Sequence, residues 1–410
     1  MPEALTRRGL LLGLAAPAVA SCTIGPHKKV VSVTDHGAVG DGQSDDTAAF
    51  LSAIKEVQGA GGGTVEVPGV ARSFRVSLVS CPSGVMLRGK GTEMPRLLGS
   101  VEIAASADDA AIENLEVRMT RGTGIRIREG AIRSSLRGVV VSGSSAVPAT
   151  TTTGILVSRG TRDTVIDRCR IDSCQEGIRA SGGFHGLTVS RSNFSAWLDR
   201  AIYLVAYAGA VTKVRIEANT VGPPLSRGRV RQPIAFAGFA GNRFADVEIR
   251  KNSVKGSGRS YTAQEEPGAA DLISLHACDR FQIDANTCSQ GGDMGITVSQ
   301  GCRSGTVTAN ICTENDAAGI IIGTGPLTED VVVERNRCVN NGRNRSGDRN
   351  ARNRAGIIVR QSKRVRVASN EIGDTNRHLT QSTGILVDRS VQVGVEFNKV
   401  VGSQPRMVVR

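Results

Sequence analysis

Short apolar runs recur along the chain from about residue 154 to its end. A Gly-Ile pair followed by two mostly apolar residues begins at Gly154, Gly177, Gly295, Gly319, Gly356 and Gly384. Intervals of 23, 24, 37 and 28 residues between copies indicate a repeat of about two dozen residues that insertions lengthen in places. Apolar and polar residues alternate within each run, which predicts strands. A period of this length is typical of a solenoid.

A second apolar run follows each first one and ends in asparagine. The asparagines at this place are Asn193, Asn219, Asn252, Asn286, Asn310, Asn336, Asn370 and Asn398. Asparagine tolerates the left-handed backbone of a tight turn, and stacked side-chain amides can hydrogen-bond from coil to coil. We therefore expect these residues to form a structural ladder and not a polar active site.

The alternation in every run requires strands on all sides of each coil. Leucine-rich repeats have a similar period but need a regular LxxLxL frame, which this chain lacks. The pattern therefore predicts an all-β, right-handed parallel β-helix, a single-stranded solenoid. Residues 48–57 form an amphipathic pattern after an acidic turn, which predicts a helix that caps the first coil.

The segment from Val33 to Gly69, which includes Asp35-His36-Gly37, Gly40-Asp41-Gly42 and Gly61-Gly62-Gly63, resembles the N-terminal motif of the pectate-lyase-like superfamily. This superfamily includes polygalacturonases, rhamnogalacturonan-degrading enzymes, epimerases and phage tailspikes. The resemblance implies a right-handed parallel β-helix that acts on polysaccharides. It also implies that the acidic residues of the motif cap and turn the chain, so we expect structural roles for Asp35, Asp41, Asp45 and Asp46.

The N-terminus is typical of an export signal. Arg7-Arg8 and the apolar stretch to Ala20 resemble a twin-arginine signal, and the residues that end at Cys22 resemble a lipobox. The expected organisation is a signal peptide over 1–21, a linker over 22–31, a cap and first coil over 32–70, and β-helix repeats over 71–410. We expect a periplasmic protein, or a lipoprotein anchored at the cell envelope through Cys22.

The net charge is +13, with lysines and arginines spread along the chain. For an exported protein the expected anionic partner is an acidic polysaccharide, with membrane contact only through a lipid anchor. A role with nucleic acid conflicts with the export signal and with the lack of interleaved aromatic residues.

Cys288, Cys312 and Cys338 each follow a ladder asparagine by two residues, so they should stack on adjacent coils as free thiols. Cys278 and Cys302 are expected to stack similarly. Cys169 and Cys174 are the best candidates for a disulfide. The cysteine and histidine spacings do not predict a zinc site.

The candidate active site lies around the strand that begins near Leu272. Asp271 precedes this strand, and Asp293 and Asp316 precede the next two, while Ser274, His276, Thr297 and Ser299 are expected to face outward. Acid–base cleavage of a glycosidic bond needs one protonated and one ionised group. We therefore predict Asp271, Asp293 and His276 as catalytic residues and Asp316, Arg179, Tyr203 and Arg280 as substrate-binding residues.

Comparison with the superfamily leaves the reaction open. Polygalacturonases have three motifs at successive strands, and Asp271 and Asp293 each match one aspartate of the first two motifs. The third motif contains a histidine, which is missing from Ala317-Ala318-Gly319. Resemblance to pectate lyases implies calcium, which Asp271, Asp293 and Asp316 would hold, and an arginine base, for which Arg179, Arg200 and Arg280 are candidates. Insertions over 256–270 and 342–354 would supply groove walls. The sequence allows a hydrolase or lyase, a non-catalytic surface or glycan-binding protein, or a uronate epimerase.

Overall fold

The computed structural model describes residues 29–69, 73–143, 152–225, 232–239, 241–256, 270–343, 353–375, 380–402 and 406–409. The export signal and Cys22 lie outside these residues, as does most of both insertions. Among the described residues, no helix is long and apolar enough to span a membrane.

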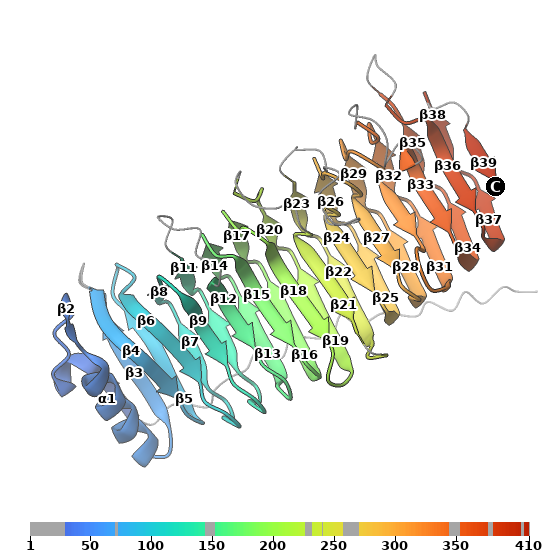
Figure 1. The fold of residues 1–410 in the computed structure, drawn as a ribbon. Coiled ribbons are helices and arrows are strands. Elements are labelled where there is room, and N and C mark those ends of the chain that lie inside the picture. The colour runs from blue at the N-terminus through green and yellow to red at the C-terminus, as the bar shows by residue number, and fades with distance from the viewer. Residues whose placement is uncertain are drawn as a thin grey trace, which may run out of the picture.

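Parallel strands stack into the predicted right-handed β-helix, with one coil above another along a single axis (Figure 1). Each complete coil has three faces. Face A is a fourteen-stranded sheet. Its strands are β1 (Lys29–Ser32), β3 (Gly63–Pro68), β5 (Val85–Lys90), β7 (Ala111–Glu113), β10 (Ser135–Arg137), β13 (Arg162–Asp167), β16 (Phe184–Ser190), β19 (Val211–Glu217), β22 (Phe244–Arg250), β25 (Cys278–Asp284), β28 (Arg303–Thr308), β31 (Thr328–Glu334), β34 (Ser362–Ala368) and β37 (Val391–Glu396).

Face B carries the Gly-Ile runs. Its strands are β9 (Gly122–Ile127), β12 (Thr152–Val157), β15 (Glu176–Ser181), β18 (Arg200–Ala206), β21 (Ile234–Gly238), β24 (Ile273–His276), β27 (Ile296–Ser299), β30 (Ile320–Ile322), β33 (Ala355–Arg360), β36 (Thr383–Asp388) and β39 (Met407–Val409).

Face C consists of short strands that follow the asparagines. They are β8 (Glu116–Arg118), β11 (Val140–Ser142), β14 (Arg170–Asp172), β17 (Asn193–Ser195), β20 (Thr220–Val221), β23 (Ser253–Lys255), β26 (Thr287–Ser289), β29 (Ile311–Thr313), β32 (Arg337–Val339), β35 (Glu371–Gly373) and β38 (Lys399–Val401). In the first coils β2 (Asp41–Asp45) pairs with β4 (Ser73–Cys81), and β6 (Arg96–Ile103) pairs with β4, β8 and β9, so β6 spans faces B and C.

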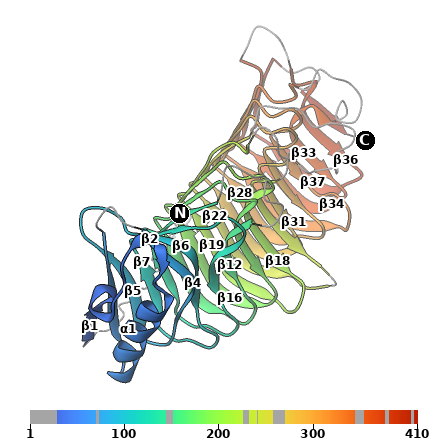
Figure 2. The same ribbon diagram turned by 60° about the vertical axis from the view of Figure 1, so that its left-hand side comes forward.

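A helix covers the first coil, as the sequence predicts. Helix α1 (Thr47–Gly59) buries Phe50, Ile54 and Val57 against the end of the solenoid (Figures 1 and 2). The short 3₁₀ helix η1 (Val33–His36) precedes it. Strand β1 starts at Lys29, so the predicted linker over 22–31 is wrong for its last three residues, which pair with β3.

The acidic residues of the N-terminal motif hold turns, as the resemblance implies. Asp35 completes a capping box with Ser32, and Asp41 accepts hydrogen bonds from the N–H groups of Gln43 and Ser44. Asp45 accepts from Thr47, and the buried Asp46 accepts from the N–H groups of Val39 and Gly40. These carboxylates therefore stabilise the backbone of the N-terminal turns.

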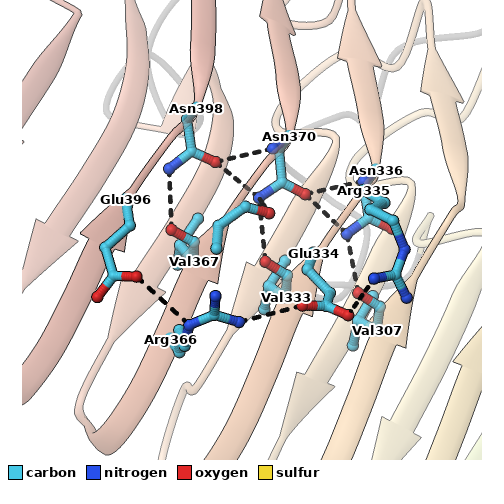
Figure 3. A network of polar contacts seen from close by, with 11 residues as sticks. Val307, Val333, Glu334, Arg335, Asn336, Arg366, Val367, Asn370, Glu396 and Asn398 are labelled. Atoms are coloured by element: carbon cyan, nitrogen blue, oxygen red, sulfur yellow. Dashed lines mark hydrogen bonds and ion pairs between the residues drawn. The ribbon is translucent and has the colours of Figure 1, made fainter. Parts of the chain in front are cut away.

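Seven of the predicted asparagines form the ladder, from Asn219 to Asn398. The backbone N–H and the side-chain amide of each donate to the Oδ1 of the next, at 2.8 to 3.0 Å (Figure 3). Asn193 was assigned wrongly, because it is exposed and lies opposite Thr220. Ser192 takes its place and donates its N–H to Asn219.

The eight cysteines of the described residues are free and buried. Cys288, Cys312 and Cys338 stack in register, as predicted, and the Cys278 N–H donates to Cys302 Sγ at 3.4 Å. The predicted pairing of Cys169 with Cys174 is wrong. The two lie on either side of β14 and both are free.

Candidate functional site

The site lies on the outer surface of face B. The repeat glycine turns toward the core, because a Cβ at Gly295 would lie 3.1 Å from the Cβ of the buried Cys312. The residue just before the glycine and the second residue after it therefore lie on the outer surface. In the coil of Gly177 these are Glu176 and Arg179, which form an ion pair at 3.2 Å. The outer surface of face B therefore has two rows of side chains along the solenoid.

Strand register aligns one of these rows across consecutive coils. The row runs from Arg179 through Tyr203, Ala235 and Ser274 to Thr297. From β30 onward the same row is apolar and buried, with Ile321, Ile358 and Leu386. The polar part of face B therefore ends at β27.

The structure brings Asp271 and Asp293 together on consecutive coils. Only 3% of Asp271 and 5% of Asp293 are exposed, and Asp271 Oδ1 accepts the N–H of Met294 at 3.2 Å. Burial and then the charge of Asp293 raise the pKa of Asp271 well above its usual value, while the hydroxyl of Thr297 and the amide of Met294 oppose the shift. Asp271 therefore retains its proton to a higher pH than an exposed aspartate does.

His276 lies at the opposite edge of face B. Its Nε2 is 2.9 Å from Ser274 Oγ, and burial lowers its pKa to about 4, so the ring is neutral at neutral pH. Five residues of strand separate it from Asp271, up to about 16 Å. His276 faces a cavity of about 580 Å³ that Phe239 and Arg303 also line. The predicted trio therefore does not converge on one point.

Asp316 is paired with an arginine of a neighbouring coil. Its Oδ1 accepts Arg343 Nη2 at 3.1 Å, and its buried Oδ2 has no partner among the described residues. The described residues contain no group of three His, Cys, Asp or Glu side chains placed to hold a metal. Of the three aspartates predicted to hold calcium, Asp271 and Asp293 lie close together, while Asp316 faces Arg343.

Tyr203 and Arg179 lie on the same face as Asp271, as predicted for substrate-binding residues. The guanidinium of Arg200 lies 4.0 Å from the centre of the Tyr203 ring, and that of Arg179 lies 5.6 Å from it. Two strand spacings, about 10 Å, separate Tyr203 from Ser274. Arg179 is ion-paired with Glu176 at 3.2 Å and Arg200 with Asp199 at 3.1 Å, so a negatively charged sugar would share these guanidinium groups with carboxylates.

The assignment of Arg280 to this site is wrong. Arg280 is the third residue of β25 on face A, beyond the corner that follows His276, and has a left-handed backbone (φ 57°). Its guanidinium pairs with Asp246 at 2.7 Å, and both residues line a separate groove of about 440 Å³. The corner between β24 and β25 therefore points Arg280 away from Asp271.

Sequence reasoning missed two polar residues of this face, Glu176 and Gln232. Glu176 precedes Ile178 by two residues, the offset that also relates Asp271 to Ile273, and Gln232 has the same offset from Ile234. Aligning every coil on this isoleucine would have predicted both residues as part of the site. Of the predicted arginine-rich wall over 342–354, Arg343 and Arg354 are described, while Arg345, Arg349 and Arg352 lie outside the described residues.

No protein-family model matches the chain. Mannuronan C5-epimerase AlgE3 of Azotobacter vinelandii is 56% identical over 46 residues, which are 11% of this chain and 2% of AlgE3. Mannuronan C5-epimerase AlgE5 of the same organism has the same identity over 46 residues, 4% of its length. The matches thus span only a few per cent of these relatives.

Solved structures share the fold over most of the chain. The A-module of the Azotobacter vinelandii mannuronan C-5 epimerase AlgE6 is 16% identical over 93% of this chain and 98% of its own, with a TM-score of 0.57. The catalytic unit of a GH87 α-1,3-glucanase from Streptomyces thermodiastaticus is 18% identical over 93% and 70%, with a TM-score of 0.66. Tailspike protein 3 of bacteriophage CBA120 is 13% identical over 92% and 62%, with a TM-score of 0.56. These likenesses confirm the parallel β-helix.

Proposed function

We propose that this protein cleaves an acidic polysaccharide on the outer surface of face B, with Asp271 and Asp293 as the proton-transferring pair. The observation that carries the proposal is the placement of two buried carboxyl groups on consecutive coils, where burial and the charge of Asp293 raise the pKa of Asp271. Arg179, Arg200 and Tyr203 on the same face supply the groups that would bind an anionic sugar.

In hydrolysis, Asp271 gives its proton to the oxygen of the scissile glycosidic bond as the carbon–oxygen bond breaks. Asp293, as carboxylate, takes a proton from the attacking water or attacks the sugar carbon itself. In both routes one water is consumed and a new reducing end forms. The raised pKa of Asp271 supports the first role, because an acid catalyst has to be protonated before the bond breaks.

Uronate epimerisation is the second candidate. It is supported by the 46-residue match to mannuronan C5-epimerases and by the shared fold over 98% of the AlgE6 A-module. Epimerisation inverts C5 without breaking the chain, whereas hydrolysis releases saturated ends and a lyase releases unsaturated ends. Product analysis therefore separates these reactions directly.

We further propose that the protein works outside the cytoplasm, anchored through a lipid on Cys22. Arg7-Arg8 and the lipobox-like residues before Cys22 support this location. Mass spectrometry of the membrane fraction should find the lipid on wild-type protein and lose it in Cys22→Ser.

The test of activity uses polygalacturonate, alginate and rhamnogalacturonan, with and without calcium. Asp271→Asn and Asp293→Asn should each lower product formation by about 10²–10⁴-fold. Asp163→Asn is the matched control, because Asp163 is exposed on face A. Full activity in both site variants would overturn the catalytic assignment. Binding by the wild type without any change in the polymer would identify a glycan-binding protein.

A further inference from the structure

A hollow in the first coils combines three arginines with no carboxylate in its lining. It has a volume of about 650 Å³ and is lined by Gly42, Arg75, Leu98, Gly99, Ser100, Arg118, Met119, Thr120 and Arg121. It lies where β2, β4 and β6 meet the end of β8, in the blue and cyan coils of Figure 1. Its polar lining is therefore electropositive.

Small residues open this hollow between the arginine side chains. At Gly99 the backbones of β4 and β6 come so close that a Cβ would lie 1.8 Å from the Val76 oxygen. Gly42 has a positive φ of 77°, which favours glycine. The shape of the hollow thus follows from the backbone at two glycines.

Arg118 and Arg121 differ from most arginines of the solenoid. Elsewhere a carboxylate of a neighbouring coil neutralises the guanidinium, as Asp279 does for Arg243 at 2.7 Å and Glu248 does for Arg215 at 2.9 Å. Arg118 and Arg121 are exposed, and neither has an ion-pair partner among the described residues. Arg75 is partly offset by Asp45, whose pKa it helps to lower.

The hollow and the candidate active site lie along the same solenoid axis. Six strand pairings lead from β6 through β9, β12, β15, β18 and β21 to β24, about 29 Å in all. Next to the hollow, the exposed Arg126 of β9 lies in register with Leu156 of β12. Leu156 is in turn in register with Arg179 of β15. A chain molecule bound along face B would meet positive charge on this route before it reaches Asp271.

We propose that the hollow binds a carboxylate or sulfate group of the polysaccharide, as a subsite remote from the reaction. The inference rests on the proposed function, because it takes the acidic polysaccharide as ligand. Guanidinium groups bind carboxylate and sulfate oxygens through paired N–H donors, and unpaired arginines need not break an existing ion pair to do so. The site selects long anionic chains over short or neutral ones.

The experiment compares Arg118→Gln/Arg121→Gln with Arg162→Gln/Arg170→Gln by isothermal titration with alginate and polygalacturonate. The control pair removes the same charge from exposed arginines of faces A and C that also lack an ion-pair partner in the described residues. The hollow variant should bind long chains about threefold to thirtyfold more weakly, and the control should match the wild type. Fragments too short to span about 29 Å should bind all three proteins equally.

The outcomes separate this inference from the proposed function. Equal long-chain affinity in the hollow variant and the wild type would overturn the subsite and leave the function intact. Equal loss in the control pair would also overturn it, because the effect would then come from net charge alone. A wild type that binds no acidic polysaccharide overturns both proposals.

Discussion

The carboxyl group of Asp271 accepts the backbone N–H of Met294, the residue that directly follows Asp293 on the next coil. One hydrogen bond between coils thus holds the carboxyl group of Asp271 against the backbone next to Asp293, and both aspartates are buried. Burial and the charge of Asp293 then hold a proton on Asp271. The following predictions test this arrangement and the solenoid that supports it.

Activity of the wild type should fall as pH rises through the raised pKa of Asp271. The acid form is the active one, so deprotonation removes the proton donor. A profile of kcat/KM against pH on the preferred polymer measures this descending limb. A profile without a descending limb on its alkaline side would contradict the role of Asp271 as acid.

Asp271 should also make stability depend on pH. A folded-state pKa above the unfolded value of about 3.9 means that stability is lost as pH rises from there through the folded pKa. Asp271→Asn removes this loss, because asparagine cannot ionise. The difference in melting temperature between Asp271→Asn and the wild type should therefore increase with pH. The same difference for Asp163→Asn should not change with pH.

His276 should give the opposite dependence. Its pKa of about 4 lies below the usual 6.5, so stability is lost as pH falls from about 6.5 through 4, by up to about 3 kcal/mol. Denaturant unfolding of wild type and His276→Gln at pH 7 and pH 4 measures this difference. An NMR titration of the ring that centres near 6.5 would show that the imidazole is not buried.

Asn286→Ala should cost about 3 kcal/mol or more in unfolding free energy. The side chain donates to Ile249 and Asn310 and accepts from Asn252, so its loss leaves buried polar groups unpaired. Asn193→Ala is the control, because Asn193 is exposed and outside the ladder, and should cost less than about 0.5 kcal/mol. Similar losses in both variants would contradict the register.

The eight cysteines of the described residues should react with a thiol reagent only after unfolding. All are buried, and burial raises the pKa of Cys169 and Cys174 to about 12, so neither the reactive thiolate nor access is available in the folded protein. Titration in native buffer and in guanidinium measures this difference. A melting temperature that falls on adding reductant would instead indicate a disulfide.

The sequence by itself determined the solenoid, because period-two strands, the repeat length and asparagines in register leave few other ways to bury the apolar positions. It also placed Asp271 and Asp293 just before neighbouring strands of one face, because the repeat aligns equivalent positions of successive coils. The prediction for Asn193 was wrong by one residue of register. The prediction for Arg280 was wrong because the chain turns a corner between two faces before it reaches this residue.

Only the tertiary structure decided which polar groups meet across coils. The pairing of Asp316 with Arg343, and the contact of Asp271 with the coil that carries Asp293, join residues more than twenty positions apart. The hollow at Arg118 and Arg121 depends on the close backbones at Gly99, which no local pattern reveals. Strand periodicity is a local property, whereas ion pairing and burial depend on the register between coils.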